Sequence, residues 1–176
     1  MRAVAALALA AALLAGCAMP VFRDTSVPIS SAAGFDPARY TGLWYEIARF
    51  PVRFQEGCVG VTAAYEPRDD GTLGVVNTCR DSLDGGTARQ IAGFAEVVGP
   101  GRLKVRLDGV PVAADYWVLW TDDTYETAVV AVPSGRAGWV LSRTPDLRED
   151  RWRAALRVLE FNGFDIAKLE RTPQGS

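Results

Sequence analysis

The sequence offers few side chains that could do chemistry together. It contains no His, so the commonest general base and the commonest metal ligand are absent from the chain. Two adjacent pairs of carboxylates, Asp69-Asp70 and Asp122-Asp123, are candidate acid–base groups, but both pairs lie in stretches typical of turns, where Asp is favoured for backbone reasons. We therefore expect no catalytic residue, no metal site and no cofactor, and we expect the protein not to be an enzyme.

Three cysteines remain, and the first has a distinctive setting. Cys17 follows an apolar run at residues 3–15, which itself follows Arg2. The run is too short to span about 30 Å of hydrocarbon, which needs about 20 residues, and it is typical of a signal peptide. The stretch LAGC that ends at Cys17 resembles a bacterial lipobox, which implies that residues 1–16 are removed and that Cys17 carries the lipid anchor.

This resemblance implies a location. Lipoprotein sorting would give Cys17 a diacylglyceryl group and an N-acyl chain, and several acyl chains hold a protein firmly on a membrane. Ala18 follows instead of Asp, which favours the outer membrane of a bacterial cell envelope, with the soluble domain facing the periplasm. An ordinary secretory peptide and an uncleaved anchor are the alternatives.

The next segment is interpreted as a linker. Residues 17–33 contain Pro20, Pro28 and four Ser or Thr residues between 25 and 31, without a helical or strand period. This composition is typical of a flexible tether. The folded domain is then expected at residues 34–176.

Bulk composition narrows the class of protein. The chain has 176 residues, of which 49% are hydrophobic, so one domain with a proper core is expected. Its net charge is -2 and its Lys and Arg residues form no stripe, which argues against a nucleic-acid partner.

From residue 42 onward, apolar and polar residues alternate as in half-buried strands. Eight short runs follow one another with only turns between them, at 42–50, 58–66, 72–79, 90–98, 102–107, 115–120, 125–132 and 138–143. Without crossover helices, the sheet should be antiparallel, and closing it removes both exposed edges. The sequence therefore predicts an all-β fold, an eight-stranded antiparallel up-and-down β-barrel whose interior is filled or holds one small ligand.

The period changes after Thr144. Thr144 is a candidate N-cap, Pro145 suits the first helical position and Gly163 is a natural C-terminal cap. A helix of about 15 residues is predicted, with an apolar stripe that packs on the outside of the barrel. A last short strand is expected at 164–169.

Three motifs resemble those of the lipocalin family, as found in bacterial outer-membrane lipocalins and apolipoprotein D. The opening FDPARYTGLWYEIARF contains Gly42 and Trp44, the stretch 115–130 contains Thr121-Asp122, and WVLSRTP contains Arg143. Asp123 departs from the family pattern, in which many members carry Tyr. The resemblance implies that these five residues share the closed end of the barrel, where Arg143 packs on Trp44, and that they are structural.

The same topology places four loops at the open rim, at 51–57, 80–86, 108–114 and 133–137. The rim and the interior are expected to bind a small hydrophobic ligand, with candidate pocket residues at Phe54, Val61, Phe94, Tyr116 and Trp139. A simple packing role at the rim is an equally good interpretation of Phe54. The direction in which each strand residue faces stays open.

The two remaining cysteines lie in one predicted hairpin. Cys58 begins the second strand and Cys79 ends the third, and a turn at 69–70 pairs residues whose numbers sum to about 137–141. Exported proteins keep disulfides, so a Cys58–Cys79 bond at the open rim is expected, allowing for a bulge. Two unpaired thiols are the alternative.

The family resemblance implies a function. We expect an anchored carrier or store of fatty acids or lysophospholipids with a role in envelope lipid maintenance, bound to the membrane by its lipid. A lipocalin-fold enzyme and an interaction protein with a filled barrel are the alternatives, and a homodimer across the open rim stays open.

Overall fold

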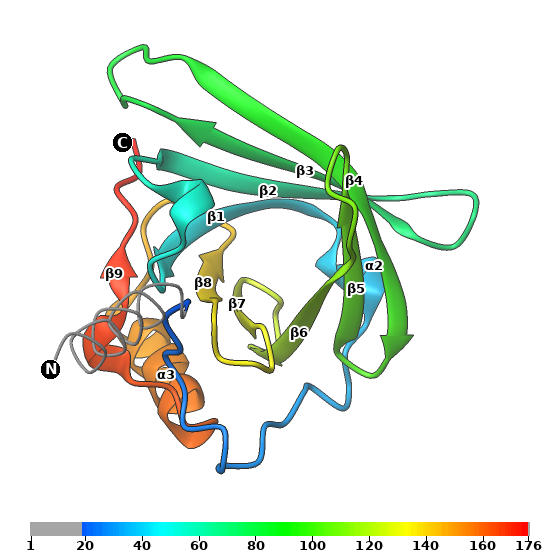
Figure 1. Cartoon of the computed structure of the whole chain (residues 1–176), viewed down its shortest axis with the longest axis vertical. Helices are drawn as coiled ribbons and strands as arrows, with labels where there is room; N and C mark the ends of the chain where they lie inside the picture. The colour runs from blue at the N-terminus through cyan, green and yellow to red at the C-terminus, as the bar shows by residue number, and fades with distance from the viewer. Residues whose placement is uncertain (1–18, 176) are drawn as a thin grey trace, which may run out of the picture.

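The strands of the chain form a closed barrel. The computed structural model describes residues 19–175, so the predicted signal peptide and Cys17 lie outside it. Eight antiparallel strands follow in chain order, and β1 pairs with both β8 and β2, which closes the sheet (Figure 1). This confirms the predicted fold. The strands are β1 (Gly42–Arg49), β2 (Val59–Pro67), β3 (Leu73–Arg80), β4 (Ala88–Gly99), β5 (Arg102–Leu107), β6 (Ala114–Thr121), β7 (Thr127–Ala131) and β8 (Gly138–Ser142).

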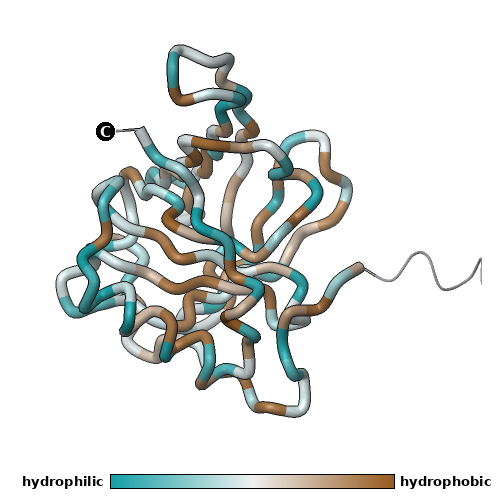
Figure 2. The backbone as a smooth tube through the Cα atoms, turned by 90° about the vertical axis from the view of Figure 1, so that its left-hand side faces the viewer, coloured by the Kyte–Doolittle hydropathy of each residue, from teal (hydrophilic) through white to brown (hydrophobic). Residues whose placement is uncertain are grey.

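Hydrophobic and hydrophilic residues interchange along the chain (Figure 2), and the buried apolar side chains form two layers. One layer lies inside the barrel and includes Trp44, Tyr65 and Val118. The other lies outside, where helix α3 (Glu149–Phe161) covers the barrel wall and contributes Ala155 and Leu159. Strand β7 is buried at all five positions because one face meets the interior and the other meets the helix layer. The predicted outer helix is confirmed.

The start of that helix differs from the prediction. It begins at Glu149 after Arg148, not at Pro145, and the Thr144 hydroxyl donates to the carbonyl of Asp146 at 2.7 Å instead of capping the helix. Glu149 and Asp150 occupy the first turn, where the helix dipole favours negative charge. Gly163 ends the helix as expected, with a left-handed φ of 83°.

The C-terminal segment also differs. The predicted strand at 164–169 is instead a short 3-10 turn, η2 (Ile166–Lys168), followed by the two-residue strand β9 (Glu170–Arg171), which pairs with β1. Beyond it, Gly60 donates to the carbonyl of Pro173 at 2.8 Å. The Gln174 amide donates to the carbonyls of Glu46 at 2.7 Å and Val61 at 3.0 Å.

These bonds close a seam in the barrel. Strands β1 and β2 pair directly only over residues 42–45 and 62–65. Beyond that stretch, the segment Thr172–Gln174 lies between the two strands and bonds to both. The C-terminal tail is therefore part of the barrel wall near the open rim.

The predicted tether is wrong for the residues that the structure describes. The segment at 22–32 follows the outside of the barrel, from Phe22, which donates to the carbonyl of Gly135 at 2.7 Å, to Ala32, which donates to that of Val118 at 2.8 Å (Figure 1). Arg23 is buried, and its Nε donates to the carbonyl of Asn162 at 2.7 Å. The folded domain therefore begins before residue 34.

Among residues 19–175, no helix has both the length and the apolar character needed to span a bilayer.

Candidate functional site

The closed end of the barrel is plugged by Trp44 and Arg143. Trp44 is fully buried, and its indole N–H donates to the carbonyl of Tyr40 at 2.8 Å. The Arg143 guanidinium lies 3.7 Å from the centre of the Trp44 ring, a cation–π contact. Gly42 has a φ of 95°, and a Cβ there would lie 3.2 Å from Arg143 Nη1, so a larger residue would strain the backbone beside this contact.

Arg143 also holds the closed end together through backbone oxygens. Its guanidinium donates to carbonyls on both sides of the plug, those of Arg39 (2.9 Å), Thr41 (2.8 Å), Leu43 (2.9 Å) and Tyr125 (3.2 Å). Such a fan of acceptors suits the five donors of a planar guanidinium. The side chain is therefore a clamp at the floor.

Asp122 organises the turn between β6 and β7, next to Thr121. Its carboxylate accepts the backbone N–H groups of Thr124 (3.2 Å), Glu126 (2.8 Å) and Thr127 (2.5 Å). Partial burial raises the pKa of Asp122, but the hydrogen bonds from Thr124 and Thr127 and the charge of Arg151 outweigh it and lower the pKa below its ordinary 3.8. These contacts make the carboxylate part of the turn.

Above the plug, three tyrosines meet inside the barrel. The Tyr116 hydroxyl lies 2.9 Å from that of Tyr40 and accepts the hydroxyl of Tyr65 at 3.0 Å. Tyr40 and Tyr65 are buried, and Tyr116 is half-buried. Burial raises the pKa of all three phenols, to about 12 for Tyr65. The hydroxyls pair with one another, so the tyrosine rings form an apolar floor.

The inner wall of the barrel is not fully packed. The half-buried apolar residues that border the inner cluster include Ala63, Val97, Val105, Tyr116 and Trp139. Of these residues, Val105 and Trp139 lie toward the mouth ends of β5 and β8, so inward side chains stay partly accessible in the upper interior. This upper interior is the candidate ligand site.

A polar chain links this interior to the mouth and the seam. The Trp139 indole N–H donates to Gln55 Oε1 at 2.9 Å, and Gln55 Nε2 donates to Glu46 at 2.6 Å. Gln55 belongs to the short helical turn η1 (Arg53–Gln55) on the first mouth loop. Glu46 is buried and also accepts from Arg49 (2.8 Å) and Thr172 (2.6 Å), so its charge is matched. Gln55, Tyr40 and Tyr65 also belong to this site, although they are not among the pocket residues predicted from the sequence.

The five predicted pocket residues do not all line one site. Tyr116 and Trp139 lie inside the barrel, with ring centres 6.3 Å apart. Val61 is buried beside the seam, and Phe54 is exposed at the mouth. The prediction that Phe94 lines the pocket is wrong. Its neighbour Ala95 belongs to the inner cluster, so Phe94 faces outward, where the Arg68 guanidinium lies 5.6 Å from its ring centre.

The mouth is tied by a disulfide bond between Cys58 and Cys79, whose Cα atoms lie 5.3 Å apart. This confirms the predicted pairing. The ladder between β2 and β3 shifts register between Val59 and Thr62, which is the bulge that the numbering required. Within residues 19–175, no three His, Cys, Asp or Glu side chains gather in a way that could hold a metal ion.

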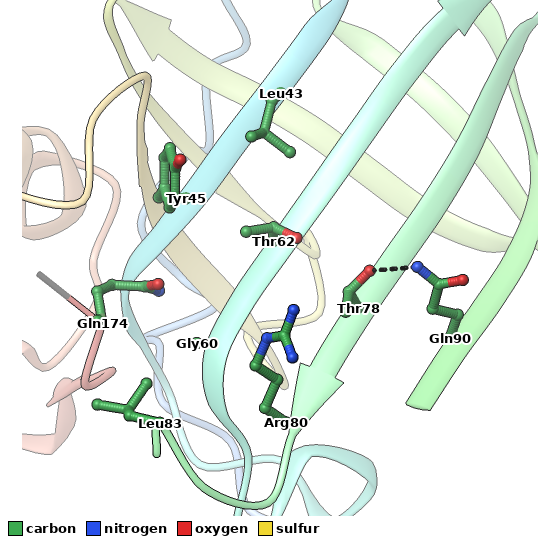
Figure 3. A pocket seen from close by; sticks show the side chains of 10 residues that line it. Leu43, Tyr45, Gly60, Thr62, Thr78, Arg80, Leu83, Gln90 and Gln174 are labelled. Carbon is green, nitrogen blue, oxygen red and sulfur yellow. Dashed lines mark hydrogen bonds between the residues drawn. The ribbon is translucent and has the colours of Figure 1, made fainter. Parts of the chain in front are cut away.

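The outer wall has hollows of its own. One, of about 420 Å³, is lined by outward residues of β1 to β4, among them Tyr45, Thr62 and Arg80, and Thr78 there accepts a hydrogen bond from Gln90 at 3.1 Å (Figure 3). Another, of about 470 Å³, lies between β6 and α3 and is bordered by Trp120 and Phe161. Both lie outside the barrel. The first is mostly polar, whereas the second is lined mainly by apolar side chains.

Comparisons with known proteins agree with this architecture. Residues 35–174 match the family description "Lipocalin-like domain". The chain is 39% identical to the outer membrane lipoprotein Blc of Escherichia coli (strain K12) over 167 residues, covering 93% of this chain and 92% of that protein. It is 38% identical to temperature-induced lipocalin-1 of Arabidopsis thaliana (80% of each chain) and 31% identical to apolipoprotein D of Macaca fascicularis (85% and 82%).

Solved structures show the same fold at lower identity. Lobster apocrustacyanin A1 superposes with a TM-score of 0.67 at 19% identity, covering 90% of this chain and 94% of that chain. Insecticyanin from the tobacco hornworm Manduca sexta gives 0.66 at 21% identity, covering 85% and 89%. With its closed eight-stranded barrel, its plug of Trp44 and Arg143 and these matches, the chain belongs to the lipocalin family.

Proposed function

We propose that the protein binds one amphipathic lipid, a fatty acid or a lysophospholipid, inside the barrel and carries or stores it. The observation that carries this proposal is the contrast between the two ends. Trp44 is fully buried at the closed end, whereas inner-wall residues such as Val105 and Trp139 stay half-buried toward the mouth. Burying an acyl chain there would contribute about 0.8 kcal/mol per CH₂.

The orientation of the ligand follows from the lining. The tail would lie against the aromatic rings of Tyr116 and Trp139, which border the inner cluster. The head group would remain at the mouth, because taking an unpaired charge out of water is costly. No cofactor and no catalytic step are part of this proposal.

We also propose where the protein is located in the cell. Residues 14–17 resemble a lipobox, and the relatives from Escherichia coli and Vibrio cholerae are named outer membrane lipoproteins. We infer that residues 1–16 are removed, that Cys17 carries the acyl chains and that the barrel faces the periplasm, where it would serve envelope lipid maintenance. The mass of the protein purified from membranes tests the anchor.

Ligand binding can be tested in solution with the chain from Ala18 to Ser176, which contains every residue that the structure describes. Titration with lysophosphatidylcholine and with palmitate, followed by tryptophan fluorescence and calorimetry, should show one saturable site with competition between the two lipids. A flat response by both methods would refute the carrier function and favour an interaction protein with a filled barrel.

A matched pair of variants tests where the lipid binds. Ala63 borders the inner cluster, whereas its neighbour Ala64 points to the opposite face of β2. Ala63→Phe should weaken binding at least about tenfold by filling the space for the tail, an effect of the size expected for a few displaced CH₂ groups. Ala64→Phe should leave binding unchanged. Equal effects of the two substitutions would place the site outside the barrel.

A further inference from the structure

The mouth of the barrel exposes large apolar side chains. Phe54 is 72% exposed on the loop after β1, and Val110 and Val112 are 43% and 69% exposed on the loop after β5. Leu83 on the loop after β3 is also exposed, but it lies against the outer wall beside Gly60 (Figure 3). No part of the chain within residues 19–175 shields these side chains from solvent as core residues are shielded. Gathered apolar exposure of this kind marks an interaction surface.

The turns at the opposite end have a different character. The turn between β2 and β3 carries Arg68, Asp69 and Asp70, and the turn between β6 and β7 carries Asp122 and Asp123. These residues are charged, and Arg68, Asp70 and Asp122 bond within their own turns, as Arg68 does with Asp70 at 3.1 Å. The exposed large apolar residues near that end, Leu43 and Val98, lie on strands β1 and β4 and not at the tips of these turns.

The path of the N-terminal segment leads to the same end. Phe22 bonds to Gly135 in the loop after β7, which is a mouth loop, and the Arg23 Nη1 donates to the carbonyl of Pro133 in that loop at 3.2 Å. The Phe22 ring stacks on Phe50, at the mouth end of β1, with ring centres 5.2 Å apart. The chain therefore leaves the barrel beside the mouth, where Met19 and Val21 are exposed.

This path limits where a lipid on Cys17 can lie. A fully extended chain spans at most about 3.6 Å per residue, so the Cα of Cys17 lies within about 7 Å of that of Met19 and within about 18 Å of that of Phe22. An anchor at Cys17 is consequently held at the mouth end of the barrel. This step rests on the lipid anchor of the proposed function.

The charges of the mouth loops define the kind of contact. The loops carry Arg53, Arg80 and Arg136 together with the acidic residues Glu56, Asp81, Asp84 and Asp108. This balance gives anionic surfaces no electrostatic advantage. A contact made by these loops must come from the apolar tips and should depend little on salt.

We propose that the open mouth of the barrel rests on the membrane that holds the Cys17 anchor, with the apolar tips of the mouth loops inserted among the lipids. The ligand would then pass between the bilayer and the barrel without crossing water. The anchor and the apolar tips lie at one end of the molecule, and a bilayer is the one partner that engages both.

The test uses the acylated protein reconstituted in phosphatidylcholine vesicles whose acyl chains carry bromine, which quenches tryptophan fluorescence on contact. Val112 on the mouth loop and Val98 on β4, beside the closed-end turn, are 69% and 52% exposed and form a matched pair. The tryptophan of Val112→Trp should be quenched beyond the unsubstituted protein, and that of Val98→Trp should not. Equal quenching at both positions, or none at either, overturns the proposal.

A second measurement uses the chain from Ala18 to Ser176 without acyl chains. Phe54→Ser combined with Val112→Ser should lower its partition into phosphatidylcholine vesicles about tenfold or more, whereas Val98→Ser should not change it. If the double variant instead abolishes a dimer in sedimentation without changing vesicle partition, the mouth is an interface between two copies and the proposal is wrong. Lipid titrations in solution and the mass of the membrane form test the proposed function separately.

Discussion

At the scale of single residues, Thr127 has a buried side-chain hydroxyl that makes no hydrogen bond within residues 19–175. The residue lies on β7 and is fully buried. An unpaired buried hydroxyl costs about 1–3 kcal/mol. Thr127→Val keeps the shape and removes the hydroxyl, so it should raise the free energy of unfolding in urea by about 1 kcal/mol.

The same substitution at Thr172 serves as a control of opposite sign. Thr172 is also buried, but its hydroxyl donates to Glu46 at 2.6 Å. Thr172→Val should lower the free energy of unfolding by about 1–3 kcal/mol, because a buried carboxylate loses a donor. A loss of stability at Thr127 as large as that at Thr172 would show that the Thr127 hydroxyl is bonded after all.

The three tyrosine hydroxyls are linked through Tyr116. Tyr116→Phe leaves the hydroxyls of Tyr40 and Tyr65 without their common partner, so it should cost about 1–3 kcal/mol for each buried hydroxyl that stays unpaired. Tyr65→Phe removes only one bond and leaves Tyr116 paired with Tyr40. Urea unfolding should therefore rank Tyr116→Phe as the more destabilising change, and the reverse order would contradict this arrangement.

At the scale of elements, the disulfide fastens the mouth ends of β2 and β3. Cys58 and Cys79 are 21 residues apart in sequence. Closing a loop of that length removes chain entropy from the unfolded state worth about 3 kcal/mol. Replacing both cysteines by Ser should lower the unfolding free energy by about this amount, and the unsubstituted protein under reducing conditions should match the variant. Equal stability of oxidised and reduced protein would refute the estimate.

The barrel and its plug can be predicted from the sequence, whereas the direction in which some strand residues face cannot. Strand alternation and the motif residues Gly42, Trp44 and Arg143 predict the barrel and its plug, because burial on one face leaves a period of two in the sequence. Phe94 was misplaced because its strand is apolar on both faces, with Ile91 and Val97 on one and Phe94 and Val98 on the other. The outer face there is covered by the Arg68 side chain, which composition does not reveal.

The contacts of the segment at 22–32 could not be predicted for a different reason. It is held by single bonds from separate residues, such as Phe22 to Gly135 and Ala32 to Val118, and such bonds leave no repeating pattern. The seam formed by Thr172 and Gln174 cannot be predicted from the sequence either, because both residues bond to Glu46, more than 100 residues away. Both cases are tertiary contacts that only the closed barrel creates.

At the scale of the whole molecule, ionisation sets the pH range of stability. The chain has no His, so no side chain of that type changes charge near neutrality. On the acid side, the turn carboxylate Asp122 has a pKa below its ordinary 3.8. Because its folded pKa is depressed, its contribution to stability is present above the unfolded pKa and is lost as the pH falls through the folded one. Stability should therefore change little across neutral pH.

At alkaline pH, ionisation of the buried tyrosines should lower the free energy of unfolding. Burial raises the pKa of Tyr65 from 10.0 to about 12 and raises those of Tyr40 and Tyr116 as well. The unfolded chain releases these protons near pH 10, whereas the folded chain holds them longer, so stability is full below pH 10 and falls as the pH rises toward the folded pKa. Tyr65 alone accounts for about 3 kcal/mol over this interval, at about 1.4 kcal/mol per pH unit.

The measurement is the unfolding free energy in urea between about pH 8 and pH 12, compared for the unsubstituted protein and Tyr65→Phe, because the pKa of Tyr65 lies in that interval. The variant should lose stability with a shallower slope above pH 10, since one of three protons no longer contributes. It should not become flat, because Tyr40 and Tyr116 still titrate in the same direction. Identical slopes would mean that the Tyr65 phenol reaches solvent, and the upper interior of the barrel would then extend down to the aromatic floor.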